Sequence, residues 1–218
     1  VYAGMIDAMD YNIGRLISYL KDSGEFDNTV IIFTSDNGPE PSDPYIMNPL
    51  APLAIENLLG YTNDYETLGE RGSYNTIGAS FASAASGPLG HYKFHSGEGG
   101  MRVPMIISGP PLDKSKQGSI SHSRAFVKDL APTILAIAGT QHPGTEYQGK
   151  NIEPVTGKNL LPVIAGAVET VYTDSDIIAY EIGGNAALIK GDYKIVLNRS
   201  AIIDSDNDGQ WHLYNITQ

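Results

Sequence analysis

The sequence predicts an α/β protein with a mostly parallel sheet and flanking helices, followed by a small antiparallel subdomain. Three observations lead to this prediction. A one-faced helical pattern opens the chain, a continuous apolar run follows at residues 29–33, and short strand patterns separated by glycines fill the last fifty residues. We expect residues 1–165 to form the α/β part and residues 166–218 to form the small antiparallel subdomain.

The first element is a helix that is already under way at Val1. Its apolar residues recur at steps of three and four, which is typical of an amphipathic helix with one buried face; they are Met5, Ile6, Met9, Ile13, Leu16, Ile17 and Leu20. Ser23-Gly24 is the natural end of this helix. A chain that opens inside an element resembles a piece of something longer.

The second element is a strand that leads into a polar turn. Residues 29–33 are mostly β-branched or aromatic, and such a run is typical of a strand buried on both faces of a parallel sheet. Asp36 and Asn37 follow directly, at the sheet edge where α/β proteins bind ligands. A carboxylate beside an amide carbonyl suits Ca²⁺ or Mg²⁺. The alternative is that Asn37-Gly38 is only a turn, since this pair is also a strong hairpin signal.

The middle of the chain is predicted to be mostly loop until a second strand and a second helix. Residues 39–90 contain five early prolines and then many small residues, and long loops of this kind are usually functional or disordered. A strand is expected at residues 101–108. A helix is expected at residues 126–138, with Gly139 as its end, and Pro132 either lies in its first turn or marks a kink.

The last part of the chain predicts a small antiparallel sheet. Four short strand candidates occur there, at residues 177–182, 186–189, 193–197 and 211–214. Gly183-Gly184 and Gly191-Asp192 separate the first three at hairpin distance.

Composition excludes several classes of function. The 218 residues carry a net charge of −11, which argues against binding to the phosphate backbone of nucleic acids. The sequence has no cysteine, so it has no disulfide, no zinc–thiolate site and no thiol nucleophile. No apolar run approaches the roughly 20 residues that a membrane-spanning helix needs.

A further polar motif surrounds Lys93. This lysine precedes a Glu98-Gly-Gly turn by five residues, and its ammonium group suits an anionic group such as sulfate or phosphate. The alternative is an ordinary solvated lysine. Glu98 and Arg102 are spaced so that they could pair and hold the loop in shape. His95 is close enough to Lys93 to line a substrate pocket, or it has a surface role.

Taken together, these segments resemble the sulfatase family of the alkaline phosphatase superfamily. The matching motifs, in chain order, are Met9-Asp10 with Gly14-Arg15, residues 27–29, residues 33–38, Tyr92-Lys93, residues 98–104, residues 129–133 with Ala138-Gly139, residues 190–196 and residues 211–216. They span nearly the whole chain. The resemblance implies an alkaline phosphatase-like fold in which residues 1–165 are the C-terminal part of the catalytic domain.

The resemblance also implies a mechanism. Asp36 and Asn37 would be two ligands of a Ca²⁺ ion, with Mg²⁺ as a substitute, and Lys93 would grip the sulfate group near the leaving oxygen. His95 is a second candidate for substrate binding. Family members carry a formylglycine nucleophile that matures from a Cys- or Ser-x-Pro-x-Arg motif, and these 218 residues contain no such motif. We therefore expect this chain to be the C-terminal half of a sulfatase, inactive alone, with the N-terminal half as its partner.

The function predicted for the parent protein is hydrolysis of sulfate monoesters, aryl or carbohydrate rather than lipid. A phosphomonoesterase or phosphodiesterase of the same superfamily is one alternative, and a noncatalytic remnant that serves as a binding module is another. Localisation stays open, although sulfatases are often exported. Asp204, Asp206 and Asp208 copy the first half of an EF-hand loop, so a second cation site is weighed there against a polar turn.

Overall fold

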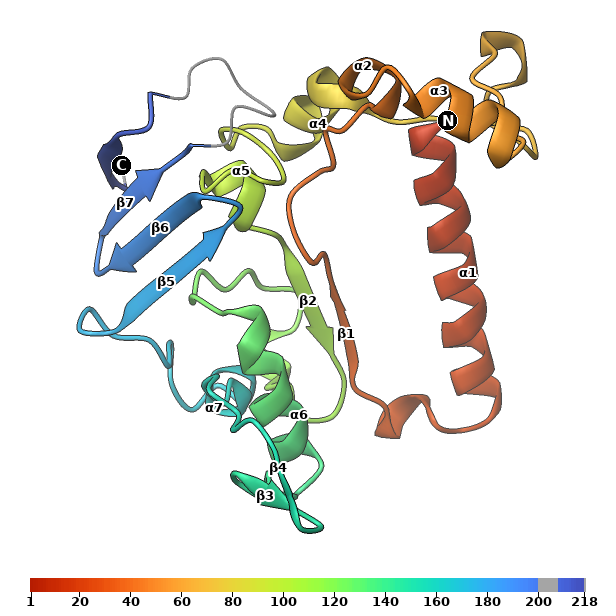
Figure 1. The fold of residues 1–218 in the computed structure, drawn as a ribbon. Coiled ribbons are helices and arrows are strands. Elements are labelled where there is room, and N and C mark those ends of the chain that lie inside the picture. Colours follow the sequence, from red (N-terminus) through yellow and green to blue (C-terminus); the bar gives the residue numbers. More distant parts are fainter. Residues whose placement is uncertain (200–207, 218) are drawn as a thin grey trace. The chain divides into compact units, whose positions relative to one another are not determined.

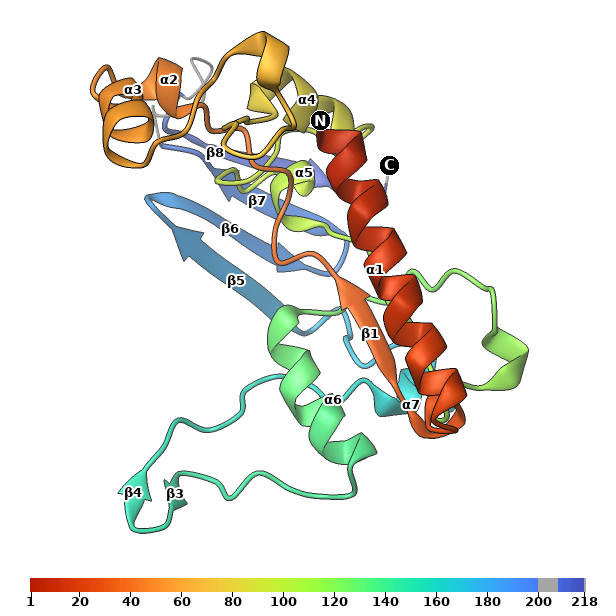
Figure 2. The same cartoon turned by 90° about the vertical axis from the view of Figure 1, so that its right-hand side faces the viewer.

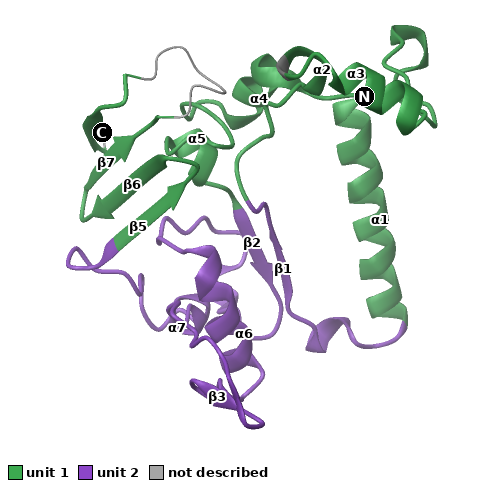
Figure 3. Ribbon diagram, viewed as in Figure 1, with its two compact units in different colours: residues 1–22, 37–104, 178–218 green, residues 23–36, 105–177 purple. Residues whose placement is uncertain are grey.

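A computed structural model describes residues 1–199 and 208–217 of the chain. The described chain forms two compact units (Figure 3). The first unit contains residues 1–22, 37–104 and 178–218, and the second contains residues 23–36 and 105–177. Both units mix helices and strands. The predicted domain boundary after residue 165 stays a prediction.

The first unit opens with the predicted amphipathic helix. Helix α1 runs from Tyr2 to Asp22, and Gly24 follows it with a φ of +77° that suits a helix end (Figure 1). The predicted helix is thus confirmed. Its apolar face is not buried by the described residues, however, because Met5, Ile6 and Leu16 are each 45–59% exposed. None of the described helices is both long and apolar enough to cross a membrane.

Residues 39–90, expected to be loop, contain several short helices. These are α2 (Pro44–Met47), α3 (Ala51–Leu53), a π-helical turn at Ala54–Leu58 and α4 (Gly78–Ser86). The side chain of Asp43 accepts a hydrogen bond from the Tyr45 N–H group, so it caps α2, and Pro44 occupies a first-turn position where proline needs no donor. Pro44 and Pro52 therefore stand in the first turns of helices rather than exclude them. Helix α4 is built largely from alanine and serine, and alanine is the best helix former.

The C-terminal antiparallel sheet is confirmed. Strands β5 (Ile177–Ile182), β6 (Asn185–Lys190), β7 (Tyr193–Leu197) and β8 (Trp211–Asn215) lie in that order (Figure 2). β6 pairs with β7 and β7 with β8 in antiparallel register. One face of the sheet is buried through Ala187 and Val196, and Lys194 lies on the same face of β7 as Val196.

The second unit contains the first two strands. β1 (Ile31–Thr34) pairs with β2 (Met105–Ser108) in antiparallel register, with Ile31 opposite Ser108 and Thr34 opposite Met105. The named strands whose register is described are all antiparallel, so they do not support the predicted mostly parallel sheet. The prediction assumed burial on both faces, yet Phe33 is 43% exposed. An apolar run indicates a strand but does not fix the direction of its neighbour.

The rest of the second unit follows the sequence pattern closely. A 3₁₀ turn at Val127–Asp129 leads into α6 (Leu130–Ile137), which has Pro132 in its first turn. Gly139 ends the helix with a φ of +65°, as predicted. The unit also contains a small hairpin of β3 (Glu146–Tyr147) and β4 (Lys150–Asn151), and helix α7 (Leu161–Ile164).

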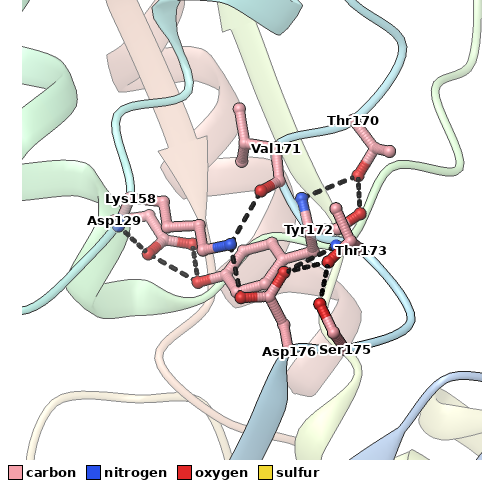
Figure 4. A network of polar contacts seen from close by, with 8 residues as sticks. All are labelled: Asp129, Lys158, Thr170, Val171, Tyr172, Thr173, Ser175 and Asp176. Atoms are coloured by element: carbon pink, nitrogen blue, oxygen red, sulfur yellow. Dashed lines mark hydrogen bonds and ion pairs between the residues drawn. The ribbon is translucent and has the colours of Figure 1, made fainter.

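A largely buried polar network joins the start of α6 to residues 158–176 (Figure 4). Asp129 is fully buried, and its carboxylate accepts hydrogen bonds from the Phe126 N–H, the Lys158 N–H and the Tyr172 hydroxyl at 2.7–2.8 Å. Burial and this bond to Asp129 raise the pKa of Tyr172, so its hydroxyl stays protonated and donates. A buried carboxylate with three donors is fully satisfied, so we assign Asp129 a structural role.

The same network continues to Asp176 at its more exposed side. Lys158 Nζ lies 4.6 Å from the centre of the Tyr172 ring and donates to the Val171 carbonyl and, at 2.6 Å, to Asp176. Asp176 also accepts bonds from the N–H and hydroxyl of Thr173. Lys158 first, and then Thr173, lower the pKa of Asp176 from 3.8 to about 2.

This shift predicts a pH-dependent contribution of Asp176 to stability. A carboxylate whose pKa is lower in the folded state stabilises the fold above its unfolded pKa, and the stabilisation is lost as the pH falls through the folded value. Urea denaturation should therefore show that Asp176→Asn is less stable than the wild type at pH 6, and that this difference shrinks between pH 3.8 and about 2. Asp174→Asn, a change at an exposed neighbour, is the control. A difference for Asp176→Asn that does not vary with pH would contradict the assignment.

Candidate functional site

Asp36 and Asn37 lie just beyond the carboxyl end of β1, as the sequence predicts. The division into compact units falls between them, so Asp36 is described with the second unit and Asn37 with the first. The chain bends here without forming a hairpin, since the partner of β1 is the distant β2. Asn37-Gly38 is therefore not the turn of a hairpin, while the interpretation of this pair as only a turn, without a metal, stays a prediction. Asp36 is exposed, and its carboxylate has no hydrogen bond or ion pair with another described residue.

Gly38 packs directly against the turn that carries the Glu98-Gly-Gly motif. Its N–H group donates to the Gly100 carbonyl at 2.9 Å, and a Cβ atom at Gly38 would overlap the Gly99 carbonyl oxygen. Gly99 and Gly100, in helix α5 (Glu98–Met101), are themselves pressed against backbone carbonyls of residues 90–95. Two motifs sixty residues apart in the sequence are thus in backbone contact, and only glycine leaves room for that contact.

Lys93 lies beside the segment that follows Asn37. Its backbone N–H donates to the Pro39 carbonyl at 3.1 Å, and its ammonium group forms an ion pair with Glu40 at 2.7 Å. The ammonium group also lies 5.2 Å from the centre of the Phe94 ring. The structure therefore brings Lys93 close in space to the Asn37-Gly38 turn, with its side chain about one-third exposed.

The Lys93 loop (residues 91–98) has an unusual backbone. His91 and Phe94 have φ values of +68° and +75°, in the left-handed region that costs a residue with a side chain about 1–3 kcal/mol. His95 is 4% exposed, stacks on the His91 ring at 4.5 Å and meets the edge of the Tyr92 ring at 5.2 Å. A surface role for His95 is therefore wrong, and its role in substrate binding stays a prediction.

The C-terminal sheet stabilises this loop through buried polar contacts. Asn185, buried at the start of β6, donates to the Phe94 carbonyl, and Asn198, just after β7, accepts from the Ser96 N–H at 3.1 Å. Lys194, which is 2% exposed, forms an ion pair with Glu98 at 2.6 Å. A strained conformation persists only where its surroundings impose it, and these contacts supply that constraint.

The pairing of Glu98 corrects one expectation. The spacing in the sequence allows Glu98 to pair with Arg102, yet Glu98 binds Lys194 and Arg102 is exposed. The four-residue spacing suggested Arg102 as the partner of Glu98. In the structure Glu98 instead pairs with Lys194, a buried residue of β7 that is 96 positions away in the sequence. The alternation of β7 contained the signal, since it places a lysine on the same face as Val196. No comparable sequence pattern predicted the ion pair between Lys93 and Glu40.

The described residues contain no group of three or more His, Cys, Asp or Glu side chains arranged for a metal ion. Asp36 and Asn37 offer two hard oxygen donors, which fits part of the six to eight that Ca²⁺ takes. Asp204 and Asp206 of the EF-hand-like segment lie outside the described residues. Asp208 is described, and its carboxylate meets His212 Nε2 at 3.0 Å.

Comparison with known proteins identifies the family of the chain. A family model described as Sulfatase matches residues 1–140. The chain is 37% identical over 219 residues to an uncharacterized sulfatase of Schizosaccharomyces pombe, covering 100% of this chain and 38% of that protein. It is 33% identical over 161 residues to an arylsulfatase of Klebsiella aerogenes, covering 73% of this chain and 33% of that protein.

A solved structure supports the fold. It is a sulfatase studied for the metabolism of multiple glycosaminoglycans by Bacteroides thetaiotaomicron, with a TM-score of 0.56 and 19% identity over 96% of this chain and 37% of that one. The chain belongs to the sulfatase family. It spans about a third to two-fifths of the length of these relatives.

The contact between the two glycine turns gives a stability prediction. Gly38→Ala should lower the free energy of unfolding by about 1–3 kcal/mol, because the added methyl group meets backbone that cannot move aside. Gly14→Ala is the control, since a Cβ atom there meets no atom within 4 Å and alanine favours helix α1. Chemical denaturation of both variants measures the difference. Equal stability of Gly38→Ala and the wild type would contradict the described contact.

Proposed function

We propose that the protein containing this chain hydrolyses sulfate monoesters, and that Lys93 binds the sulfate group. Family membership supports sulfate ester hydrolysis in general. The observation that carries the role of Lys93 is its place beside the Asn37-Gly38 turn, with its side chain partly exposed and its ammonium group already bound to an anionic oxygen, that of Glu40. An ammonium group in this position favours an oxyanion over a neutral ligand.

We propose Ca²⁺ as the metal, with Mg²⁺ as a substitute and with Asp36 and Asn37 as two of the ligands. The donor set fits a hard cation, because both side chains offer oxygen and Asp36 makes no competing bond in the described structure. When bound, such an ion polarises sulfate oxygens as a Lewis acid. The remaining ligands would come from residues other than these two.

In the proposed reaction, Lys93 acts on the bond that breaks. Negative charge grows on the bridging oxygen as the S–O bond lengthens, and a preorganised ammonium donor stabilises this charge more than it stabilises the bound substrate. The C-terminal sheet would then position Lys93 through the Lys93 loop. The nucleophile would be the formylglycine known from the family, whose Cys- or Ser-x-Pro-x-Arg motif is absent from these 218 residues.

Aryl sulfates are the first substrates to test, because one relative is an arylsulfatase. Carbohydrate sulfates are the second class. A phosphate ester serves as the comparison that separates a sulfatase from a phosphatase of the same superfamily. Faster hydrolysis of the phosphate ester would favour the phosphatase, and no hydrolysis of any of these esters would favour a binding module.

The role of Lys93 predicts a large kinetic effect. In the full-length natural protein, Lys93→Ala should lower kcat for p-nitrophenyl sulfate by about 10²–10³-fold, the usual loss when one such donor is removed. Lys150→Ala removes an exposed lysine of β4 and is the matched control, with kcat expected to stay at the wild-type value. Steady-state kinetics with saturating Ca²⁺ measures both. If the two variants behave alike, Lys93 does not act in the reaction.

A further inference from the structure

The ammonium group of Lys93 is paired with the carboxylate of Glu40. Glu40 Oε2 lies 2.7 Å from Lys93 Nζ, and the side chains are 45% and 34% exposed, respectively. The Pro39 carbonyl accepts a hydrogen bond from the Lys93 N–H. Because Glu40 is the next residue after Pro39, this bond places Glu40 beside Lys93. An oxyanion that reaches Lys93 therefore meets a carboxylate at the same ammonium group.

Glu40 is oriented toward Lys93 by a second contact. Its other oxygen, Oε1, accepts a hydrogen bond from the Ser42 N–H at 2.9 Å. Burial raises the pKa of Glu40, but the bonds from Lys93 and Ser42 outweigh this effect, and the pKa is lower than usual. The carboxylate is therefore charged at neutral pH and is held in one orientation by two donors.

A fixed negative charge at this place acts unequally on different substrates. A sulfate monoester carries one negative charge, whereas a phosphate monoester carries close to two at pH 8, because its second pKa is near 6. Coulomb repulsion is proportional to the product of the charges, so Glu40 repels the dianion about twice as strongly as the monoanion. The attraction of Lys93 alone would favour the dianion instead.

We propose that Glu40 is a specificity-determining residue that discriminates against dianionic phosphate monoesters at the Lys93 site. It offsets part of the charge of Lys93, so that a singly charged sulfate ester is accepted while a doubly charged ester is penalised. The proposal deepens the proposed function, since it rests on Lys93 as the sulfate-binding residue. The sequence leaves open whether the ester is a sulfate or a phosphate, and Glu40 would contribute to that selectivity.

The test is the ratio of kcat/KM for p-nitrophenyl phosphate to kcat/KM for p-nitrophenyl sulfate, measured at pH 8 in the full-length natural protein. Glu40→Gln should raise this ratio roughly five- to tenfold, because it removes a unit charge next to the bound anion. Glu66→Gln removes one charge from an exposed helical turn elsewhere and should leave the ratio unchanged. Glu40→Asp keeps the charge and should stay near the wild-type ratio.

The outcomes separate the two proposals. If Glu40→Gln and Glu66→Gln give the same ratio while Lys93→Ala still loses sulfatase activity, Glu40 does not set specificity and the role of Lys93 stands. If Glu40→Gln lowers both rates equally, together with the melting temperature, Glu40 is only structural and the inference is overturned. If Lys93→Ala keeps full activity toward the sulfate ester, the proposed function of Lys93 itself fails.

Discussion

The candidate site depends on the backbone contact between Gly38 and the Gly99-Gly100 turn. The hydrogen bond from the Gly38 N–H to the Gly100 carbonyl forms only because no side chain lies between the two turns. This contact brings the segment after Asn37 to the Lys93 loop. The bond between Lys93 and Pro39 and the ion pair between Lys93 and Glu40 follow from that approach. Three glycines thus bring together polar residues that are far apart in the sequence.

The two ion pairs of this region have different physical roles. Lys194 is almost fully buried, so the loss of Glu98 would leave an uncompensated charge inside the protein. That pair holds the Lys93 loop against the C-terminal sheet. The pair of Lys93 and Glu40 is much more exposed and therefore adds little to stability. An exposed pair can open for a ligand, which is what an anion-binding lysine requires.

The sequence predicted the elements with strong local periodicity. Helix α1, helix α6 with Gly139 as its end, and the strands of the C-terminal sheet all follow from spacing and glycine positions. The antiparallel direction of β2, the partner of β1, could not be predicted, because an apolar run does not indicate how the neighbouring strand is oriented. The short helices of residues 39–90 were missed because prolines and small residues are ambiguous between loop and first-turn positions.

Prediction of the site was uneven for a similar reason. Asp36, Asn37 and Lys93 stood out through their motifs and the resemblance to sulfatases. Glu40 and Lys194 did not, because their partners are 53 and 96 positions away and no local pattern links them. Long-range pairs of this kind are a consequence of the fold, so they become visible only once the loop and the sheet are in place.

The most direct test of the account is a crystal structure of the full-length natural protein with Ca²⁺ and inorganic sulfate. The account predicts a Ca²⁺ ion bound by the side-chain oxygens of Asp36 and Asn37, and a sulfate oxygen within hydrogen-bond distance of Lys93 Nζ. It also predicts that the contact between Lys93 and Glu40 is lengthened when sulfate is bound. Sulfate bound away from Lys93, with the ion pair intact and no metal at Asp36, would contradict it.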